Sequence, residues 1–262
     1  MDNFKNNNKH RRYRAHVSIF GTTQLHLKSP YMVAFWSVAF PGFGHLLISK
    51  YIRGMLLFIW EIYINQTTNL NLAMVYSFMG DIEAAKEVLN FKMMHLYIPV
   101  YLFAILDSYR TAVDTNKIYL LAKRENAPFN SFTIGALEYN YLDKKSPLST
   151  LFWSMTIPSL GQLYINRIVL AAFHLIMTVI FIYHSHLLEG LHYLILGDIA
   201  KSTSVLNPQW LLYFPSFYFF TIYDSYTNTV ENNKLYEDEQ RNYLKQHYQP
   251  SNFMIMKGMK VK

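Results

Sequence analysis

Two acidic residues within apolar stretches have the clearest capacity for chemistry. Asp107 and Asp224 lie at equivalent places near the ends of two apolar stretches. An ionisable side chain inside a membrane-spanning helix marks a candidate ion or proton pathway. The structural alternative is an ion pair, for which Arg53 and Arg167 are the candidate partners. No nucleophile accompanies these carboxylates, so no catalytic residue and no enzyme activity are expected.

Four other titratable positions carry weaker signals. Glu61 interrupts an apolar stretch, where it could face a cavity or mark the end of a short helix. His184 and His186 could ligate a metal, but no acidic partner has suitable spacing and the chain has no Cys. We therefore expect no metal site and no cofactor. His174, inside an apolar stretch, is expected to be a hydrogen-bonded packing residue.

An internal repeat organises these residues. With an offset of 117 positions and no gap, residues 29–119 and 146–236 share 28 identities in 91 positions. Several identities are polar, so shared hydrophobicity does not account for them. Duplication of one unit is the best explanation. The matched motifs include Phe35-Trp36-Ser37 with Phe152-Trp153-Ser154, Gly80-Asp81-Ile82 with Gly197-Asp198-Ile199, and Asp107-Ser108-Tyr109 with Asp224-Ser225-Tyr226.

Proline and glycine break the first apolar stretch of each unit. The breaks contain Pro41 with Gly44 and Pro158 with Gly161. Proline removes an amide donor, and glycine frees the backbone. At membrane depth, such backbone must be covered by protein or line a wet cavity. The segment could therefore be a kinked span, a re-entrant segment or an interfacial one.

A short helix is expected near the middle of each unit. Asp81 and Asp198 each follow a glycine, and an aspartate at the first turn suits the helix dipole. The pattern predicts helices over 81–89 and 198–206, ended by Asn90 and Asn207.

Composition favours a membrane protein. Hydrophobic residues make up 52% of the chain, aromatic residues 17% and charged residues only 16%. The apolar residues come in long blocks, whereas a compact soluble protein, the alternative, would show amphipathic stripes. Aromatic side chains suit the membrane–water interface. The predicted apolar stretches are 31–49, 54–72 and 93–109, then 148–166, 168–188 and 209–226.

The basic residues predict an orientation. Residues 1–28, 110–145 and 227–262 each hold six of the 24 Lys and Arg residues. Cytoplasmic segments carry an excess of these residues. With all three segments inside, each unit crosses the membrane twice and the two units are parallel. This arrangement places 21 basic residues inside and three outside. The rival arrangement has three spans in each unit, which would invert the second copy and place 110–145 outside.

The unit resembles bacterial TM2-like small membrane domains, including multi-TM2 proteins. The resemblance is carried by Phe35-Trp36-Ser37, by the turn at Pro41-Gly42-Phe43-Gly44 and by Ile105-Leu106-Asp107-Ser108-Tyr109. The second copy matches at Pro158, Gly161 and Asp224, and the long loop at about 73–92 departs from the pattern. The resemblance implies an all-α, multi-pass membrane protein and brings no defined activity.

The chain is therefore expected to be an all-α polytopic membrane protein in five parts. These are a basic cytoplasmic segment (1–28), repeat one (29–119), a cytoplasmic linker (120–145), repeat two (146–236) and a polar cytoplasmic tail (237–262). The leading hypothesis is a non-enzymatic scaffold or accessory subunit in the cell membrane. A small transporter or channel component using Asp107, Asp224 or Glu61 is the alternative, and an intramembrane enzyme is a distant third. The expected partners are the lipid bilayer, anionic headgroups at residues 9–14, and other proteins or further copies of the chain; nucleic acid is not expected.

Overall fold

The chain is mostly helical and falls into two halves. A computed structural model describes residues 12–249. We call the helices of the first half the first unit and those of the second half the second unit. The first unit comprises α1 (Pro30–Ala39), α2 (Phe43–Leu47), α3 (Tyr51–Thr68), α4 (Leu70–Phe78), α5 (Ile82–Val88) and α6 (Phe91–Arg124). The second unit comprises α7 (Pro147–Thr156), α8 (Leu160–Tyr164), α9 (Ile168–Ser185), α10 (Leu187–Ile195), α11 (Ile199–Val205), α12 (Pro208–Leu211) and α13 (Tyr213–His247).

The bounds of these helices recur at the offset of 117. The first five helices of each unit begin and end at equivalent residues. The third apolar stretch differs, because α6 is continuous whereas its counterpart is divided into α12 and α13. Both long helices continue far beyond the predicted apolar stretches, into the residues assigned to the linker and the tail.

Local sequence explains where the helices start and stop. The Ser29 and Ser146 hydroxyls cap α1 and α7, each followed by a proline at the first helical position. The helices predicted in the middle of each unit are present as α5 and α11, each with its aspartate as N-cap. The prediction that Asn90 and Asn207 end them was wrong, because Asn90 and Asn207 are the N-caps of α6 and α12. The stretches 54–72 and 168–188 are also interrupted, at left-handed residues Asn69 and His186.

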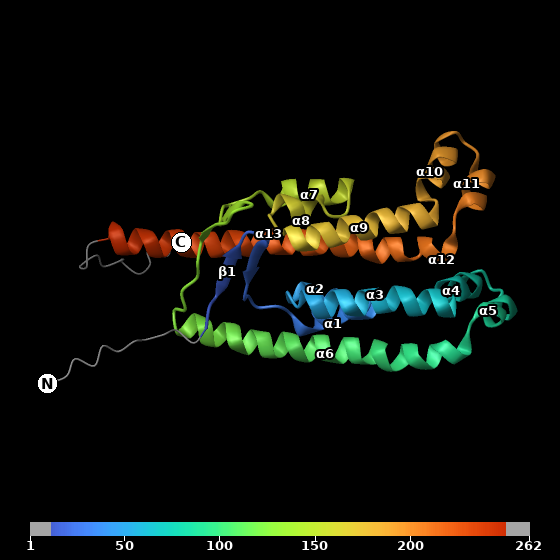
Figure 1. Ribbon diagram of the computed structural model, residues 1–262, viewed down its shortest axis with the longest axis horizontal. Helices are drawn as coiled ribbons and strands as arrows, with labels where there is room; N and C mark the ends of the chain where they lie inside the picture. The colour runs from blue at the N-terminus through green and yellow to red at the C-terminus, as the bar shows by residue number, and fades with distance from the viewer. Residues whose placement is uncertain (1–11, 250–262) are drawn as a thin grey trace, which may run out of the picture.

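The two units lie side by side in the same sense (Figure 1). Helices α3 and α9 run in one direction, and α6 and α13 return. One end of the molecule, which we call the loop end, carries α4, α5, α10 and α11. The other, the hairpin end, carries the strands, the end of α6 and the end of α13.

Two antiparallel hairpins at this end were not predicted. Strand β1 (Ala15–Ser18) pairs with β2 (Gly21–Gln24), and β3 (Phe132–Ile134) pairs with β4 (Tyr139–Tyr141). The chain is nevertheless mostly helical, as expected for an all-α protein, and the hairpins lie outside the two units, one in the segment before the first unit and one in the linker. Residues 9–11 of the basic run and residues 250–262 of the tail lie outside the described part.

Aromatic side chains fill the space between the units. Phe43 stacks on Phe220 with ring centroids 3.9 Å apart, and Phe58 meets Phe217 at 6.1 Å. Offset and edge-on aromatic pairs are each worth about 0.5–1.5 kcal/mol beyond the area they bury. The core cluster that joins the halves consists of Trp36, Phe40, Phe43, Leu46, Leu47, Phe58, Leu170, Phe181, Tyr213, Phe217 and Phe220.

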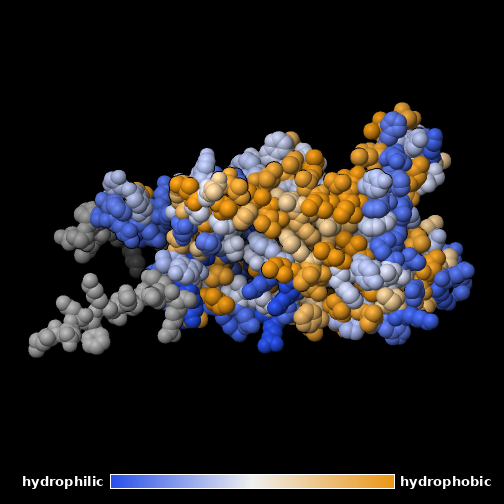
Figure 2. Space-filling view, viewed as in Figure 1, coloured by the Kyte–Doolittle hydropathy of each residue, from blue (hydrophilic) through white to orange (hydrophobic). Residues whose placement is uncertain are grey.

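One described helix, α9, is by itself long and apolar enough to cross a membrane. A second candidate arises when α5 and α6, which meet at an angle of 89°, are taken together. Helix α3 has the same length as α9 but contains Arg53, Glu61 and a polar last turn. Figure 2 shows hydrophobic residues over the middle of the visible face, with hydrophilic residues concentrated toward the two ends of the long axis.

Candidate functional site

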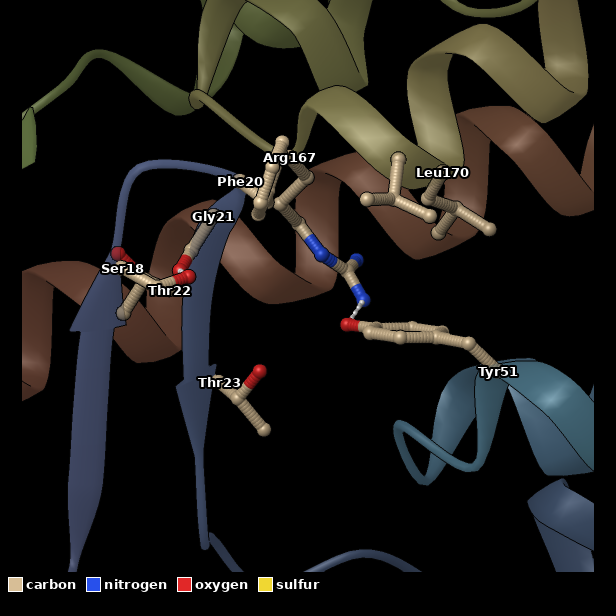
Figure 3. Close-up of a pocket in the computed structure, with 9 residues that line it drawn as sticks. Ser18, Phe20, Gly21, Thr22, Thr23, Tyr51, Arg167 and Leu170 are labelled. Carbon is tan, nitrogen blue, oxygen red and sulfur yellow. Dashed lines mark hydrogen bonds between the residues drawn. The ribbon is translucent and has the colours of Figure 1, made fainter. Parts of the chain in front are cut away.

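Asp224 is the centre of a buried charged cluster near the hairpin end. Its side chain is fully buried and accepts a hydrogen bond from Arg167 Nη1 at 2.7 Å. Asn228 Nδ2 donates to the other carboxylate oxygen at 2.8 Å. Arg167 Nη2 donates to the Tyr51 hydroxyl at 2.7 Å, so this guanidinium also joins the second unit to the first (Figure 3). The predicted pair between Asp224 and Arg167 is confirmed.

Asp107 has an equivalent but more open cluster in the first unit. Arg53 Nη1 donates to its carboxylate at 2.7 Å, and His45 Nε2 lies 2.9 Å from the same oxygen. The Asp107 side chain is 20% exposed and that of Arg53 is 52% exposed. The predicted pair is confirmed here too, although part of this site faces the surroundings.

The arginine comes from different positions in the two units. Arg167 immediately precedes α9, and its equivalent in the first unit is Lys50. Arg53 lies in the first turn of α3, and its equivalent is Leu170. Each carboxylate thus has one guanidinium partner. In the first unit the arginine lies within the first turn of the helix, and in the second unit it lies just before the helix begins.

The glycines of the two breaks allow close packing beneath these clusters. Gly42 and Ser159 have φ angles of 102° and 125°, which turn the chain sharply after the prolines Pro41 and Pro158. A Cβ on Gly44 would collide with the Ser37 hydroxyl and the Val33 carbonyl oxygen.

The same packing recurs at the second break, where a Cβ on Gly161 would collide with the Ser154 hydroxyl. The close approach brings Ser37 within 2.8 Å of Ser108 and Ser154 within 2.6 Å of Ser225. These glycines therefore hold the broken helix against α6 or α13, just beside the acidic residues.

The structure does not gather the other candidates around the aspartates. Glu61 is buried in the middle of α3, with Asn65 Nδ2 at 3.5 Å. His184 stacks on Trp210 with centroids 4.5 Å apart, and His186 Nδ1 lies 3.3 Å from Glu189. Within residues 12–249, no group of three or more His, Cys, Asp or Glu residues could hold a metal ion.

The expectation for His174 was partly wrong. Its ring is fully buried and packs edge-on against Phe217 and Phe220, at centroid distances of 5.5 and 6.0 Å. Neither ring nitrogen has a hydrogen-bond partner. His174 is thus a packing residue in an aromatic environment, without the predicted hydrogen bond.

Sequence reasoning missed a cavity at the hairpin end. It has a volume of about 210 Å³ and lies between the β1–β2 hairpin and the starts of α3 and α9 (Figure 3). Tyr51 and Arg167 face it from the two units, and Thr22 and Thr23 from strand β2. The alternation of polar and apolar residues in 15–18 was the available signal for the strand, whereas nothing in the sequence signalled that Tyr51 would meet Arg167.

Comparison with known proteins gives no relative. No family model matches the chain, and no match is found among curated proteins or solved structures.

Proposed function

We propose that the chain is a multi-pass integral membrane protein of two duplicated units, and that it acts as a non-enzymatic scaffold or accessory subunit of a membrane complex. Large hydrophobic side chains are exposed along α1, α3, α6, α7 and α9. Apolar patches of this extent mark contact with lipid or with other proteins. The matching helix bounds and the 28 shared identities support duplication.

The charge distribution supports a cytoplasmic hairpin end. The first segment, the linker and the tail carry most of the Lys and Arg residues, and their described parts lie at the hairpin end. The loop end carries Lys86, Lys92 and Lys201. Under the positive-inside rule, both units then cross the membrane outward through α3 or α9 and return through α6 or α13.

The observation that carries the scaffold proposal is the fixed pairing of the buried carboxylate. Asp224 is held by both Arg167 and Asn228. A carboxylate in an ion pathway must bind and release its ion, whereas a buried pair of this kind resists any change of charge. Stacked rings such as Phe43 and Phe220 also occupy the space between the units. The clusters therefore favour a structural role over transport.

Ion flux through reconstituted protein tests this proposal against the transporter alternative. Liposomes containing the wild-type chain would be given a proton or potassium gradient, with empty liposomes as the control. A scaffold should give the same leak as empty liposomes, and Asp107→Asn and Asp224→Asn should lower the yield of folded protein. Flux above the control that either variant abolishes while still folded would overturn the proposal.

A further inference from the structure

The interface between the two units joins two different faces. The second unit contributes the α13 face, which we define as Tyr213, Phe217, Phe220 and Tyr223. The first unit contributes the α1–α3 face, defined as Trp36, Phe40, Phe43, Leu46 and Phe58. Trp36 meets Phe220 at a centroid distance of 5.3 Å, and Phe40 meets Tyr213 at 6.0 Å. The units therefore pack head to tail, unlike two halves related by a two-fold axis.

Head-to-tail packing leaves one copy of each face without a partner. The counterpart of the α13 face is the α6 face, at Leu96, Val100, Phe103 and Leu106. The counterpart of the α1–α3 face is the α7–α9 face, at Trp153, Ile157, Leu160, Leu163 and Leu175. Every residue of both counterpart faces is apolar. Helices α6 and α7, which carry these faces, lie along opposite edges of the molecule (Figure 1).

Identical residues show the difference most directly. Trp36 is 8% exposed, whereas its counterpart Trp153 is 44% exposed. Phe220 is fully buried, whereas its counterpart Phe103 is 53% exposed. Leu46 is fully buried, whereas its counterpart Leu163 is 51% exposed. The same side chains are thus in the interface in one unit and uncovered in the other.

Two identical pairs outside these faces keep the same exposure in both units. Ser37 and Ser154, which pack inside their own units, are both fully buried. Phe35 and Phe152, which point away from the interface, are 56% and 61% exposed. Looser packing of one unit would have altered these positions as well, so the exposed counterparts reflect a missing neighbour.

We propose that a second copy of this chain is that neighbour, with the α6 face of one copy packed on the α7–α9 face of the next. Trp153 of one copy then meets Phe103 of the other, as Trp36 meets Phe220 within the chain. The contact is heterologous, so it builds a closed ring or an open array. The inference rests on the scaffold proposed above and names its partner.

This contact is weaker than the one within the chain. The internal interface also has hydrogen bonds from Arg167 to Tyr51, from Gln66 to Tyr213 and from Gln209 to Asn65. None of the three donor–acceptor pairs recurs among the counterpart residues. In lipid, apolar faces associate through packing alone, because hydrocarbon tails solvate them as well. We therefore expect association in the membrane that is lost on dilution into detergent.

Disulfide formation in membranes tests the contact. The chain has no native Cys, so introduced thiols react without background. Phe103→Cys and Trp153→Cys would be placed on separately tagged copies, expressed together and oxidised in isolated membranes. Leu102→Cys with Trp153→Cys is the matched control, because Leu102 is 52% exposed but its counterpart Phe219 faces away from the interface. We expect an adduct carrying both tags for the first pair, at least five-fold above the control.

The outcomes separate this inference from the scaffold proposal. Adducts no more abundant than the control would overturn the inference, because lipid would then cover both faces. Adducts formed mainly between two Phe103→Cys copies would also overturn it, by showing a two-fold contact through α6. Both variants alter exposed side chains, and their recovery in the membrane fraction verifies insertion. A chain missing from that fraction would instead contradict the scaffold proposal.

Discussion

The same carboxylate is paired in both units, but the surroundings of the pair differ. Arg167 and Asp224 are both buried, with a third contact from Tyr51 across the units. Arg53 is half exposed and Asp107 is near the surface. A buried charge that loses its partner costs far more than an exposed one, because water cannot replace the missing contact. The two aspartates should therefore respond unequally to the same substitution.

Replacing each aspartate with asparagine measures this inequality. Asp224→Asn leaves the buried Arg167 without a counter-charge and should lower the free energy of unfolding by about 3–5 kcal/mol. Asp107→Asn should cost about 1 kcal/mol, since the half-exposed Arg53 can turn to water. Thermal unfolding of the purified variants in one detergent gives the comparison. Equal losses in the two variants would show that burial does not govern these pairs.

His26 should make stability depend on pH. Burial, together with the nearby charges of Lys28, Arg167 and Lys234, lowers the pKa of this histidine to about 2. The unfolded chain takes up a proton below the ordinary pKa of about 6.5, and the folded chain does not. Stability is therefore full above that value and is lost as the pH falls, by about 2 kcal/mol at pH 5.

The substitution His26→Phe removes this contribution of His26 to the pH dependence of stability. The variant should lose less stability than the wild type between pH 7.5 and pH 5, as measured by thermal unfolding at several pH values. His192→Gln, at an exposed position, is the matched control and should keep the wild-type slope. An unchanged slope in His26→Phe would refute the assignment.

At the scale of elements, the sequence predicted the repeated breaks and the helix starts at Asp81 and Asp198 better than the contacts between the two units. The offset of 117, the capping aspartates and the Pro-Gly breaks act through neighbouring residues, so they could be predicted from local chemistry. The arginine partner of each aspartate was also predictable, because few cations lie near the apolar stretches. The hairpins were missed, since strands of three or four residues carry little periodicity. The contact of Tyr51 with Arg167 depends on how the two units dock, which no local pattern encodes.

The loop end contains a second polar link between elements of the two units. Gln209 at the start of α12 donates from Nε2 to the Asn65 carbonyl and side-chain oxygens, both at 3.0 Å. Its Oε1 accepts from the backbone N–H of Leu72 at 2.6 Å. Asn71 donates in turn to the Gln209 carbonyl oxygen at 3.0 Å. The cluster occurs only once in the repeat, at the interface between the units, because the counterparts of Gln209 and Asn65 are Lys92 and Ile182.

Gln209→Leu should weaken the docking of α12 on α3 and α4. The substitution leaves buried amide groups without partners, which costs about 1–3 kcal/mol for each unsatisfied group. We expect a lower midpoint of thermal unfolding and faster proteolysis of the loop end. Ser204→Ala, at an exposed position of α11, should behave as wild type. Unchanged stability in Gln209→Leu would mean that this cluster does not help to hold the units together.

At the scale of the whole molecule, the parallel orientation of the two units determines where the ion pairs, the short capped helices and the open faces lie. Parallel units place both arginine–aspartate pairs beside the starts of α3 and α9. They place both capped helices, α5 and α11, at the loop end. They also align the open α6 and α7–α9 faces for a further copy. An inverted second unit would put the equivalent elements at opposite ends of the molecule and would leave the two open faces misaligned. The central claim is therefore that two parallel units cross the membrane with the hairpin end in the cytoplasm.

Labelling of single cysteines tests that claim most directly. Glu87→Cys and Ser204→Cys lie at equivalent exposed positions of the loop end, and Ala136→Cys lies in the linker hairpin. A membrane-impermeant maleimide should label the first two variants in intact cells and the third only after permeabilisation. Labelling of Glu87→Cys and Ser204→Cys from opposite sides, or of Ala136→Cys in intact cells, would contradict the account.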